Sequence, residues 1–243
     1  MNTKEVCDAL ILEIREYFRK NNFRKAVIGL SGGIDSSLSA KLVADAIGKE
    51  NLHGLVMPVK GISSDENIND AADLCRLIGI NYSIIYINDF ITAFEKLEWQ
   101  GKIAKMNTSS RIRAVILYNY ANSNNALVIG TSNKTEIMLG YFTKYGDGAV
   151  DIEVIGSMFK TEELELARFL KIPEKIIKKI PTAELFQGQT DEEELGASYG
   201  EIDYILAKIE KNQELPQTDL AKKILKRMKD NEHKLAVPFL VRL

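Results

Sequence analysis

The segment GLSGGIDSS, residues 29–37, decides the fold of this chain. It begins at the end of the apolar run AVIGL (26–30) and leads into helical spacing of apolar residues from Ser36 to Ile47. Gly32 and Gly33 have no Cβ, so the backbone can turn sharply there and approach an anion closely. The start of the helix would direct unpaired N–H groups and its positive dipole end to the same place. The segment therefore predicts a phosphate-binding loop between a strand and a helix.

Asp35 is the unexpected residue of this loop. A carboxylate beside a polyphosphate is repulsive unless a cation lies between them, so Asp35 predicts a magnesium ion that bridges it to the phosphates. The loop lacks the lysine of the GxxxxGK[ST] motif, and the positive charge must therefore come from elsewhere in the chain. A serine-rich helix cap without a ligand is the alternative interpretation, and it leaves Asp35 unexplained.

The apolar segments of the first half alternate between strand and helix patterns. The strand candidates are AVIGL (26–30), LHGLVMPV (52–59), YSIIYI (82–87) and ALVIG (126–130), and the helix candidates are Ser36 to Ile47, Asp65 to Ile78 and about Ile103 to Asn122. Continuous apolar runs are typical of strands that helices cover on both faces. We therefore predict a doubly wound α/β fold with a mostly parallel sheet, in which ligands bind at the carboxyl ends of the strands.

The remaining segments read mainly as helices and loops. The clearest helical patterns are the N-terminal MNTKEVCDALILEIREYF, KTEELELARFLK (160–171) and DLAKKILKRMKDNEHK (219–234). Thr218 and Asp219 are both suitable N-cap residues for the last of these helices. The acidic residues of the N-terminal segment do not fit a signal peptide, and no apolar run approaches the length of a membrane span.

Composition narrows the class of protein. The chain has 243 residues and a net charge of −2, which favours one domain over 1–243 and gives no electrostatic case for binding nucleic acid or a membrane surface. We expect a cytoplasmic protein in which Cys7 and Cys75, which match no metal or redox spacing, are reduced core residues. His53 lies in a predicted strand and is expected to be structural. A hydrolase triad has little support, because the chain has only two histidines.

Longer motifs carry a resemblance to a known family. SGGxDS resembles the loop of the N-type ATP pyrophosphatases, and together with GTSNKTEIMLGYFTKYGDGAVDIEVIGSMF (130–159), PTAEL (181–185) and EHK (232–234) it resembles the ammonia-dependent NAD synthetases over about residues 5–235. The resemblance implies a Rossmann-like ATP pyrophosphatase fold. It also implies amidation of nicotinic acid adenine dinucleotide (deamido-NAD) with ammonia, the last step of NAD biosynthesis, yielding NAD, AMP and pyrophosphate through an acyl-adenylate. Family members are homodimers, and the helix carrying VILYNYAN (115–122) is a candidate interface. Nothing in the chain resembles a glutaminase domain, so we expect free ammonia as the amine donor.

The same resemblance assigns site residues. It implies that ATP binds to Gly29, Leu30, Ser31, Gly32, Gly33, Ile34, Asp35, Ser36, Thr131, Lys160 and Thr182, that Mg²⁺ binds to Asp35 and Glu136, and that deamido-NAD binds to Arg111, Lys144, Asp151, His233 and Lys234. Asp35, Lys160 and Asp151 are the implied catalytic residues. Lys160 would supply the charge that the glycine loop lacks. Asp147 and Asp151 are both candidates for the group that accepts a proton from ammonium.

Two departures from the family pattern and two rival functions stay open. The family places an arginine near adenine where this chain has Val56, and the chain continues after EHK with the apolar LAVPFLVRL. The rivals are another ATP pyrophosphatase, such as the synthetase part of GMP synthetase or a tRNA-modifying enzyme, and a nucleotide-binding sensor without catalysis. We expect the polar loops at about 63–66 and 184–193 to close over ATP.

Overall fold

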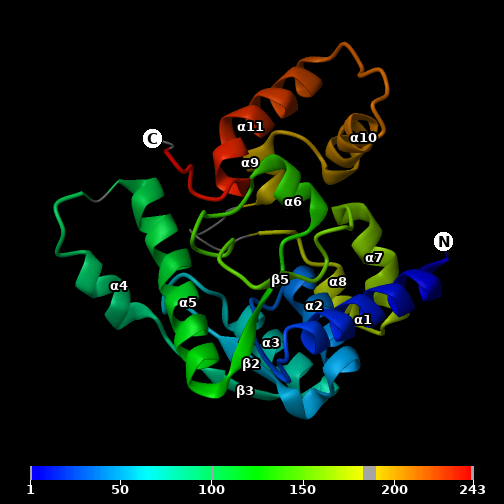
Figure 1. Ribbon diagram of the computed structural model, residues 1–243. Coiled ribbons are helices and arrows are strands. Elements are labelled where there is room, and N and C mark those ends of the chain that lie inside the picture. The colour runs from blue at the N-terminus through cyan, green and yellow to red at the C-terminus, as the bar shows by residue number, and fades with distance from the viewer. Residues whose placement is uncertain (1, 100, 183–189, 242–243) are drawn as a thin grey trace.

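The computed structural model describes residues 2–99, 101–182 and 190–241 (Figure 1). In these residues five strands form one parallel sheet in the order β3-β2-β1-β4-β5. The strands are β1 (Lys25–Gly29), β2 (Leu52–Val56), β3 (Asn81–Ile84), β4 (Ala126–Gly130) and β5 (Ile152–Glu153). The four predicted strands are present, although β2 and β3 each end three residues before the predicted segments 52–59 and 82–87 do. The sequence analysis missed β5, which is too short to show an apolar run.

Helices connect and cover the strands. They are α1 (Thr3–Lys20), α2 (Ile34–Ile47), α3 (Asp65–Ile78), α4 (Asn88–Phe94), α5 (Lys102–Asn124), α6 (Lys134–Leu139), α7 (Lys160–Phe169), α8 (Glu174–Ile177), α9 (Asp191–Leu195), α10 (Tyr199–Glu210) and α11 (Asp219–Leu235), with a 3₁₀ turn η1 (Lys49–Asn51). Each long helical pattern of the sequence is therefore confirmed, although α2 begins two residues earlier than predicted. Gly33 acts as its N-cap in extended conformation, so the helix can start directly after the glycine loop.

The two faces of the sheet are covered by different helices. Along β1, Ala26 and Ile28 pack in a core with residues of α1, α2, α3, α7 and α8, whereas Val27 between them packs with residues of α5. Successive side chains of a strand point to opposite faces, so this alternation shows that both faces are buried. The doubly wound α/β prediction is confirmed.

A third apolar cluster lies beyond the carboxyl end of the sheet. It joins Leu139 of α6 and Phe159 to Ile202 of α10 and Ile224 of α11. In Figure 1 these helices stand as a separate layer above the strands. The N-cap prediction for α11 is resolved in favour of Thr218, whose side chain accepts a hydrogen bond from the Ala221 N–H. This layer supplies one wall of the site described below.

The remaining structural predictions concern single residues. Cys7 and Cys75 are both buried free thiols. His53 contacts Ser83 through Nε2 at 3.0 Å and stacks on Tyr120 with ring centroids 4.6 Å apart, which supports its structural role. Among the described residues, no helix has the length and apolar character needed to span a membrane.

Candidate functional site

A cleft of about 750 Å³ opens at the carboxyl ends of β1, β2 and β4. Strands β1 and β4 are neighbours in the sheet, so the loops that leave them lie side by side. Most of the residues assigned to ATP line this cleft. They are Gly29, Leu30, Ser31, Gly33, Ile34, Asp35, Ser36, Thr131 and Thr182, and they are joined by Glu136 and Lys234. The structure therefore brings the glycine loop and the segment after β4 to one place.

The glycine loop depends on the absence of side chains. Gly32 has φ +83°, and a Cβ there would lie 2.3 Å from the Asn67 carbonyl oxygen. The Ser31 hydroxyl accepts a hydrogen bond from the Gly33 N–H, and Ser36 Oγ donates to the Gly33 carbonyl. Gly33 offers no side chain to cap α2, so the start of this helix keeps its first N–H groups for a ligand.

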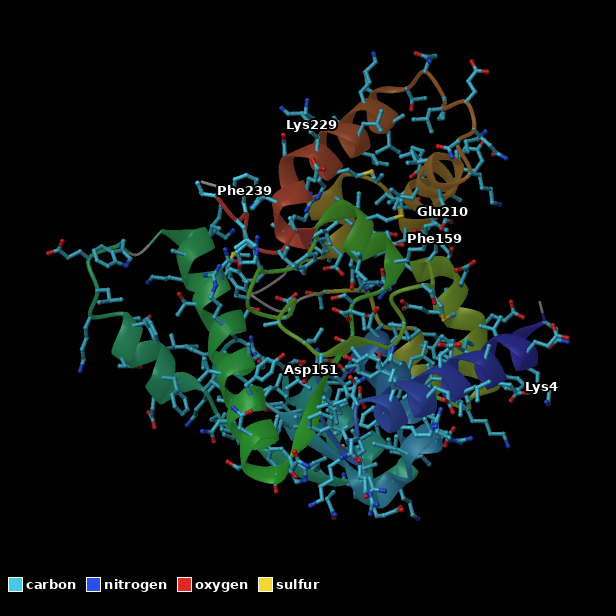
Figure 2. The ribbon with its side chains drawn as sticks, viewed as in Figure 1. Lys4, Asp151, Phe159, Glu210, Lys229 and Phe239 are labelled. Atoms are coloured by element: carbon cyan, nitrogen blue, oxygen red, sulfur yellow. The ribbon has the colours of Figure 1, made fainter. Side chains whose placement is uncertain are left out.

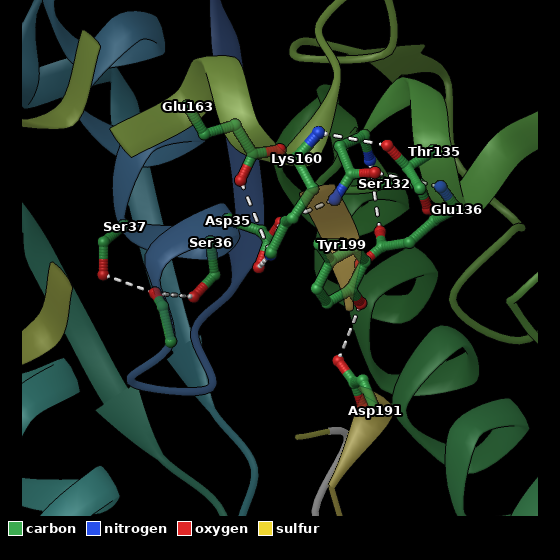
Figure 3. Close-up of polar contacts among 12 residues, drawn as sticks. Asp35, Ser36, Ser37, Ser132, Thr135, Glu136, Lys160, Glu163, Asp191 and Tyr199 are labelled. Atoms are coloured by element: carbon green, nitrogen blue, oxygen red, sulfur yellow. Dashed lines mark hydrogen bonds and ion pairs between the residues drawn. The ribbon is translucent and has the colours of Figure 1, made fainter. Parts of the chain in front are cut away.

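Asp35 and the buried Lys160 form an ion pair beside this loop (Figure 3). Lys160 is the first residue of α7, and its Nζ lies 2.5 Å from each Asp35 carboxylate oxygen. Burial by itself would raise the pKa of Asp35, but the Lys160 ammonium and the Asn133 amide hold that pKa below its usual value. Lys160 is only 7% exposed and lies behind Asp35, not on the surface of the cleft. Its positive charge stabilises the ionised carboxylate at the phosphate loop.

Glu136 is connected to Asp35 through one residue. Asn133 donates its backbone N–H to Glu136 Oε2 at 3.1 Å and its side-chain amide to Asp35 Oδ1 at 2.9 Å. Burial and then the Asp35 carboxylate raise the pKa of Glu136 well above its usual value. Two neighbouring carboxylates that both lose water favour a bound cation, and their hard oxygen atoms suit Mg²⁺.

Magnesium would need further ligands at this place. Among the described residues, no group of three or more acidic, histidine or cysteine side chains gathers around a common point. Mg²⁺ is commonly held by one or two carboxylates together with substrate phosphates and water. Asp35 and Glu136 therefore fit a metal site that the phosphates of a nucleotide complete.

The sequence analysis missed several buried groups around this pair. Glu163 of α7 is fully buried, and its Oε2 lies 3.5 Å from Lys160 Nζ. Burial and then the Asp35 carboxylate raise the pKa of Glu163 well above its usual value. Asp191 accepts hydrogen bonds from the hydroxyls of Tyr141 and Tyr199. Glu163 follows Lys160 by about one helical turn, and this spacing could have predicted from the sequence that the two side chains lie close together. No local sequence pattern indicated that Asp191 belongs to the site.

The residues assigned to deamido-NAD fall into two groups. Arg111 Nε donates to the Lys144 carbonyl at 3.3 Å, and Lys144 Nζ donates to the His233 carbonyl, so these three residues form one cluster between α5 and α11. Lys234 lies next to the cluster, donates to the Gly140 carbonyl at 2.7 Å and lines the cleft. Burial and then Arg227 lower the pKa of Lys234.

Asp151 lies apart from this cluster. Its Oδ2 accepts a hydrogen bond from the Val128 N–H at 2.7 Å, and its Oδ1 accepts one from the Tyr118 hydroxyl at 3.2 Å. Figure 2 shows Asp151 well separated from Phe239 in the C-terminal segment. Asp147, the other candidate proton acceptor, lines the cleft, and its Oδ1 accepts from Ser110 Oγ at 2.6 Å.

The structure also locates the first departure from the family pattern and parts of the two polar loops. Val56 lines the cleft, and Arg113 of α5 also lines it and donates to the neighbouring Met57 carbonyl at 3.0 Å. The guanidinium of Arg113 therefore lies on the same wall of the cleft as Val56, but it comes from α5 and not from the end of β2. In the loop at 63–66, Ser64 caps α3 by accepting from the Asn67 N–H. Residues 184–189 of the other loop lie outside the described residues, and Asp191 begins α9 after them.

Comparison with known proteins assigns the family. The family profile described as NAD synthase matches residues 6–238. The NH(3)-dependent NAD(+) synthetase of Archaeoglobus fulgidus is 41% identical over 244 aligned residues, covering 100% of this chain and 98% of the relative. The enzyme of the same name from Fusobacterium nucleatum is 42% identical over 252 aligned residues, covering 100% of this chain and 97% of that protein.

Solved structures agree in fold. The structure of NMN synthetase from Francisella tularensis has a TM-score of 0.91 at 32% identity, and the NH3-dependent NAD synthetase from Campylobacter jejuni, in complex with the nitrate ion, has 0.86 at 35% identity. Both alignments cover 100% of this chain and 100% of the solved chain. The matched sequence, the glycine loop and the parallel sheet lead to one conclusion: the chain belongs to the NAD synthase family.

Proposed function

We propose that this protein is an ammonia-dependent NAD synthetase, which amidates deamido-NAD with ammonia at the expense of ATP. The observation that carries the proposal is the convergence of the glycine loop, Asp35 and Glu136 on one cleft. A nucleotide-binding sensor would have no need for a lysine buried against Asp35 or for a second carboxylate beside it. The relatives at 41% and 42% identity carry the same activity in their names.

The chemistry begins with activation of the nicotinate carboxylate. That carboxylate is ionised at neutral pH, so its oxygen can attack the α-phosphorus of ATP without a general base. A new C–O–P linkage forms, the bond between the α-phosphorus and the bridging oxygen breaks, and pyrophosphate leaves with that electron pair. The N–H groups at the start of α2 and the hydroxyls of Ser31 and Ser36 would bind phosphate oxygens and stabilise the developing charge.

Mg²⁺ belongs to this proposal. When bound by Asp35 and Glu136, it would neutralise negative charge on the phosphates. Lys160 would keep Asp35 ionised and oriented for this purpose through its contacts with both carboxylate oxygens. We propose that Thr131 and Thr182 also contact ATP, because both line the same cleft.

Amidation completes the reaction. Ammonia attacks the carbonyl carbon of the acyl-adenylate, the C–O bond to AMP breaks, and the carboxamide of NAD forms. Ammonium must first lose a proton. Of the two candidate acceptors we favour Asp147, because it lines the cleft, whereas both carboxylate oxygens of Asp151 bind protein donors.

The dinucleotide would extend from the cleft toward the cluster of Arg111, Lys144 and His233. We propose that a homodimer completes this part of the site. Val115 on the outer side of α5 is 69% exposed, which is consistent with an interface on that helix. We further propose a cytoplasmic location, where ATP and free ammonia are both present.

A second substrate has support from one comparison. The solved structure with a TM-score of 0.91 is described as NMN synthetase. The corresponding substrate, nicotinic acid mononucleotide, carries the same carboxylate but lacks the adenylate half of deamido-NAD. The cluster of Arg111, Lys144 and His233 would then have less to bind. We therefore rank the mononucleotide second.

The deciding experiment supplies purified protein with ATP, Mg²⁺ and ammonium together with either deamido-NAD or the mononucleotide. We expect equimolar NAD, AMP and pyrophosphate from deamido-NAD, and a much lower kcat/KM with the mononucleotide. The Asp35→Ala variant should be inactive, and Asp45→Ala, an exposed change on the same helix, should retain activity. Pyrophosphate release without an amide product would contradict the proposal and favour another ATP pyrophosphatase. A preference for the mononucleotide would favour the second substrate.

A further inference from the structure

A lysine that the sequence analysis did not assign lies directly against the glycine loop. Lys179 follows α8 and precedes the PTAEL segment, and its side chain lines the cleft. Its Nζ lies 3.3 Å from the Gly32 carbonyl oxygen and also donates to the Asn67 side chain. The ammonium group is therefore within a small side-chain movement of any anion bound over the loop.

The other lysine near the loop has a different position. Lys160 is 7% exposed and contacts both oxygens of Asp35, so its charge is already committed to that carboxylate. Lys179 is 18% exposed and, unlike Lys160, lines the cleft. Since the loop lacks a lysine of its own, Lys179 is the cation that can meet a phosphate directly.

A buried carboxylate holds Lys179 in place. Asp70 of α3 is 2% exposed and forms ion pairs with both Lys179 and Lys175, the latter at 2.5 Å. Removing the partner of a buried charge normally costs several kcal/mol. Lys175 can keep its ion pair with Asp70 while Lys179 turns toward a ligand, so the Asp70 carboxylate is not left unpaired.

The remaining cations that line the cleft are held elsewhere. Lys234 donates to the Gly140 and Phe142 carbonyls, Arg227 stacks on the Tyr141 ring at 5.1 Å, and Arg113 donates to the Met57 carbonyl. None of these contacts involves the glycine loop.

We propose that Lys179 binds the β- and γ-phosphates of ATP and the departing pyrophosphate, with Asp70 and Lys175 as its support. This inference rests on the proposed NAD synthetase function, since it assigns a residue to the leaving group of that reaction. A positive charge at this position stabilises the transition state more than bound ATP, because negative charge grows on the pyrophosphate as the bond breaks.

The test compares Lys179→Met with Lys178→Met in the full chain. Lys178 is the adjacent lysine, is 74% exposed and forms an ion pair with Glu174, so its variant is the matched control. The readouts are KM and kcat for ATP, KM for deamido-NAD, and the affinity of the protein for inorganic pyrophosphate with Mg²⁺, measured by calorimetry. The calorimetry needs no turnover and so reports binding independently of catalysis.

We expect Lys179→Met to weaken pyrophosphate binding and kcat/KM for ATP by about tenfold or more, which is the scale of one charge-assisted hydrogen bond. KM for deamido-NAD should stay within about twofold, and Lys179→Arg should recover a substantial part of the loss. Lys175→Met should also weaken pyrophosphate binding, by less, because Asp70 then depends on Lys179 alone. Lys178→Met should resemble wild type.

Two results would overturn the assignment. If wild type makes NAD but Lys179→Met keeps its affinity for pyrophosphate, Lys179 does not contact the phosphates. If both substrates lose affinity equally and the melting temperature falls, Lys179 only braces the glycine loop. If wild type forms no NAD, the proposed function is wrong. The pyrophosphate titration then still tests the role of Lys179, because it needs no turnover: unchanged affinity in Lys179→Met would contradict that role.

Discussion

Around the glycine loop, Asp35 is paired with the buried Lys160 and is itself only partly exposed, whereas Arg111 and His233 lie exposed and contact the chain mainly through backbone carbonyls. In the first region each charge is fixed by another charge or by an amide of a different element. In the second region the positive groups lie at the surface between α5 and α11. In the phosphate region the charges are thus paired within the fold. We propose that in the second region, the dinucleotide region, the substrate supplies partners for the exposed cations.

This difference has an energetic cause. A buried charge is stable only when a partner replaces its water, so the phosphate region must be assembled as the protein folds. Exposed cations keep their water and make little difference to folding. Substitutions in the first region should therefore affect both chemistry and stability, and substitutions in the second should affect substrate binding alone.

Asp35→Asn is the substitution with the largest expected effect. It removes a proposed metal ligand and leaves Lys160 buried without a full counter-charge. We expect kcat/KM to fall by about a thousandfold, the scale of losing a preorganised electrostatic group. The measurement is NAD formation, with thermal unfolding to verify the fold and Asp45→Asn as the control on α2. Activity within about tenfold of wild type would show that the phosphate region does not depend on this pair.

The sequence predicted those features that depend on residues close together in the chain, and it missed those that depend on contacts between distant residues. Four strands and the glycine loop are local patterns and were found from the sequence, and the start of α11 was narrowed to two candidate caps, of which Thr218 is the one observed. β5 and the positions of Asp191 and Lys179 depend on contacts between distant segments, which no local pattern contains. The family resemblance placed Lys160 in the site, but only the structure reveals that it binds Asp35 from behind.

A second prediction concerns pH and Glu153 of β5, at the border of the phosphate region. Burial, helped by the Asp147 carboxylate and opposed by hydrogen bonds from Ser132, raises the pKa of Glu153 to about 7 from an ordinary value of 4.5. The folded state therefore binds the proton more tightly than the unfolded chain. The stability that this group contributes is complete below about pH 4.5 and is lost as the pH rises to 7, by up to about 3 kcal/mol.

Glu153→Gln removes this dependence, because an amide does not ionise and still accepts from the Ser132 N–H at 3.0 Å. The unfolding free energy of the variant should therefore improve relative to wild type by about 3 kcal/mol between pH 5 and pH 8. Denaturant melts at several pH values measure it, with the exposed Glu13→Gln as control. A difference that does not change with pH would show that Glu153 is ionised throughout this range.

Asp151 tests where the boundary between the regions lies. Its carboxylate accepts from the Val128 N–H, which belongs to a fully buried residue of β4. Asp151→Ala should lower the unfolding free energy by about 2 kcal/mol, because that N–H loses its partner. Tyr118→Phe removes only the second contact of Asp151 and should cost about 1 kcal/mol. A rise in KM for deamido-NAD with no loss of stability would instead place Asp151 in the dinucleotide region.

Arg111→Ala should have the smallest effect of these substitutions. It should also separate substrate binding from stability most clearly. Arg111 is exposed and donates a long hydrogen bond of 3.3 Å to the Lys144 carbonyl, so the melting temperature should not change. KM for deamido-NAD should rise by about tenfold, the effect of losing one charged contact to a phosphate or carboxylate, while KM for ATP stays constant. Arg19→Ala, at an exposed arginine of α1, is the control. If KM for ATP rises instead, Arg111 acts on the phosphate region, and the two regions do not divide the substrates between them.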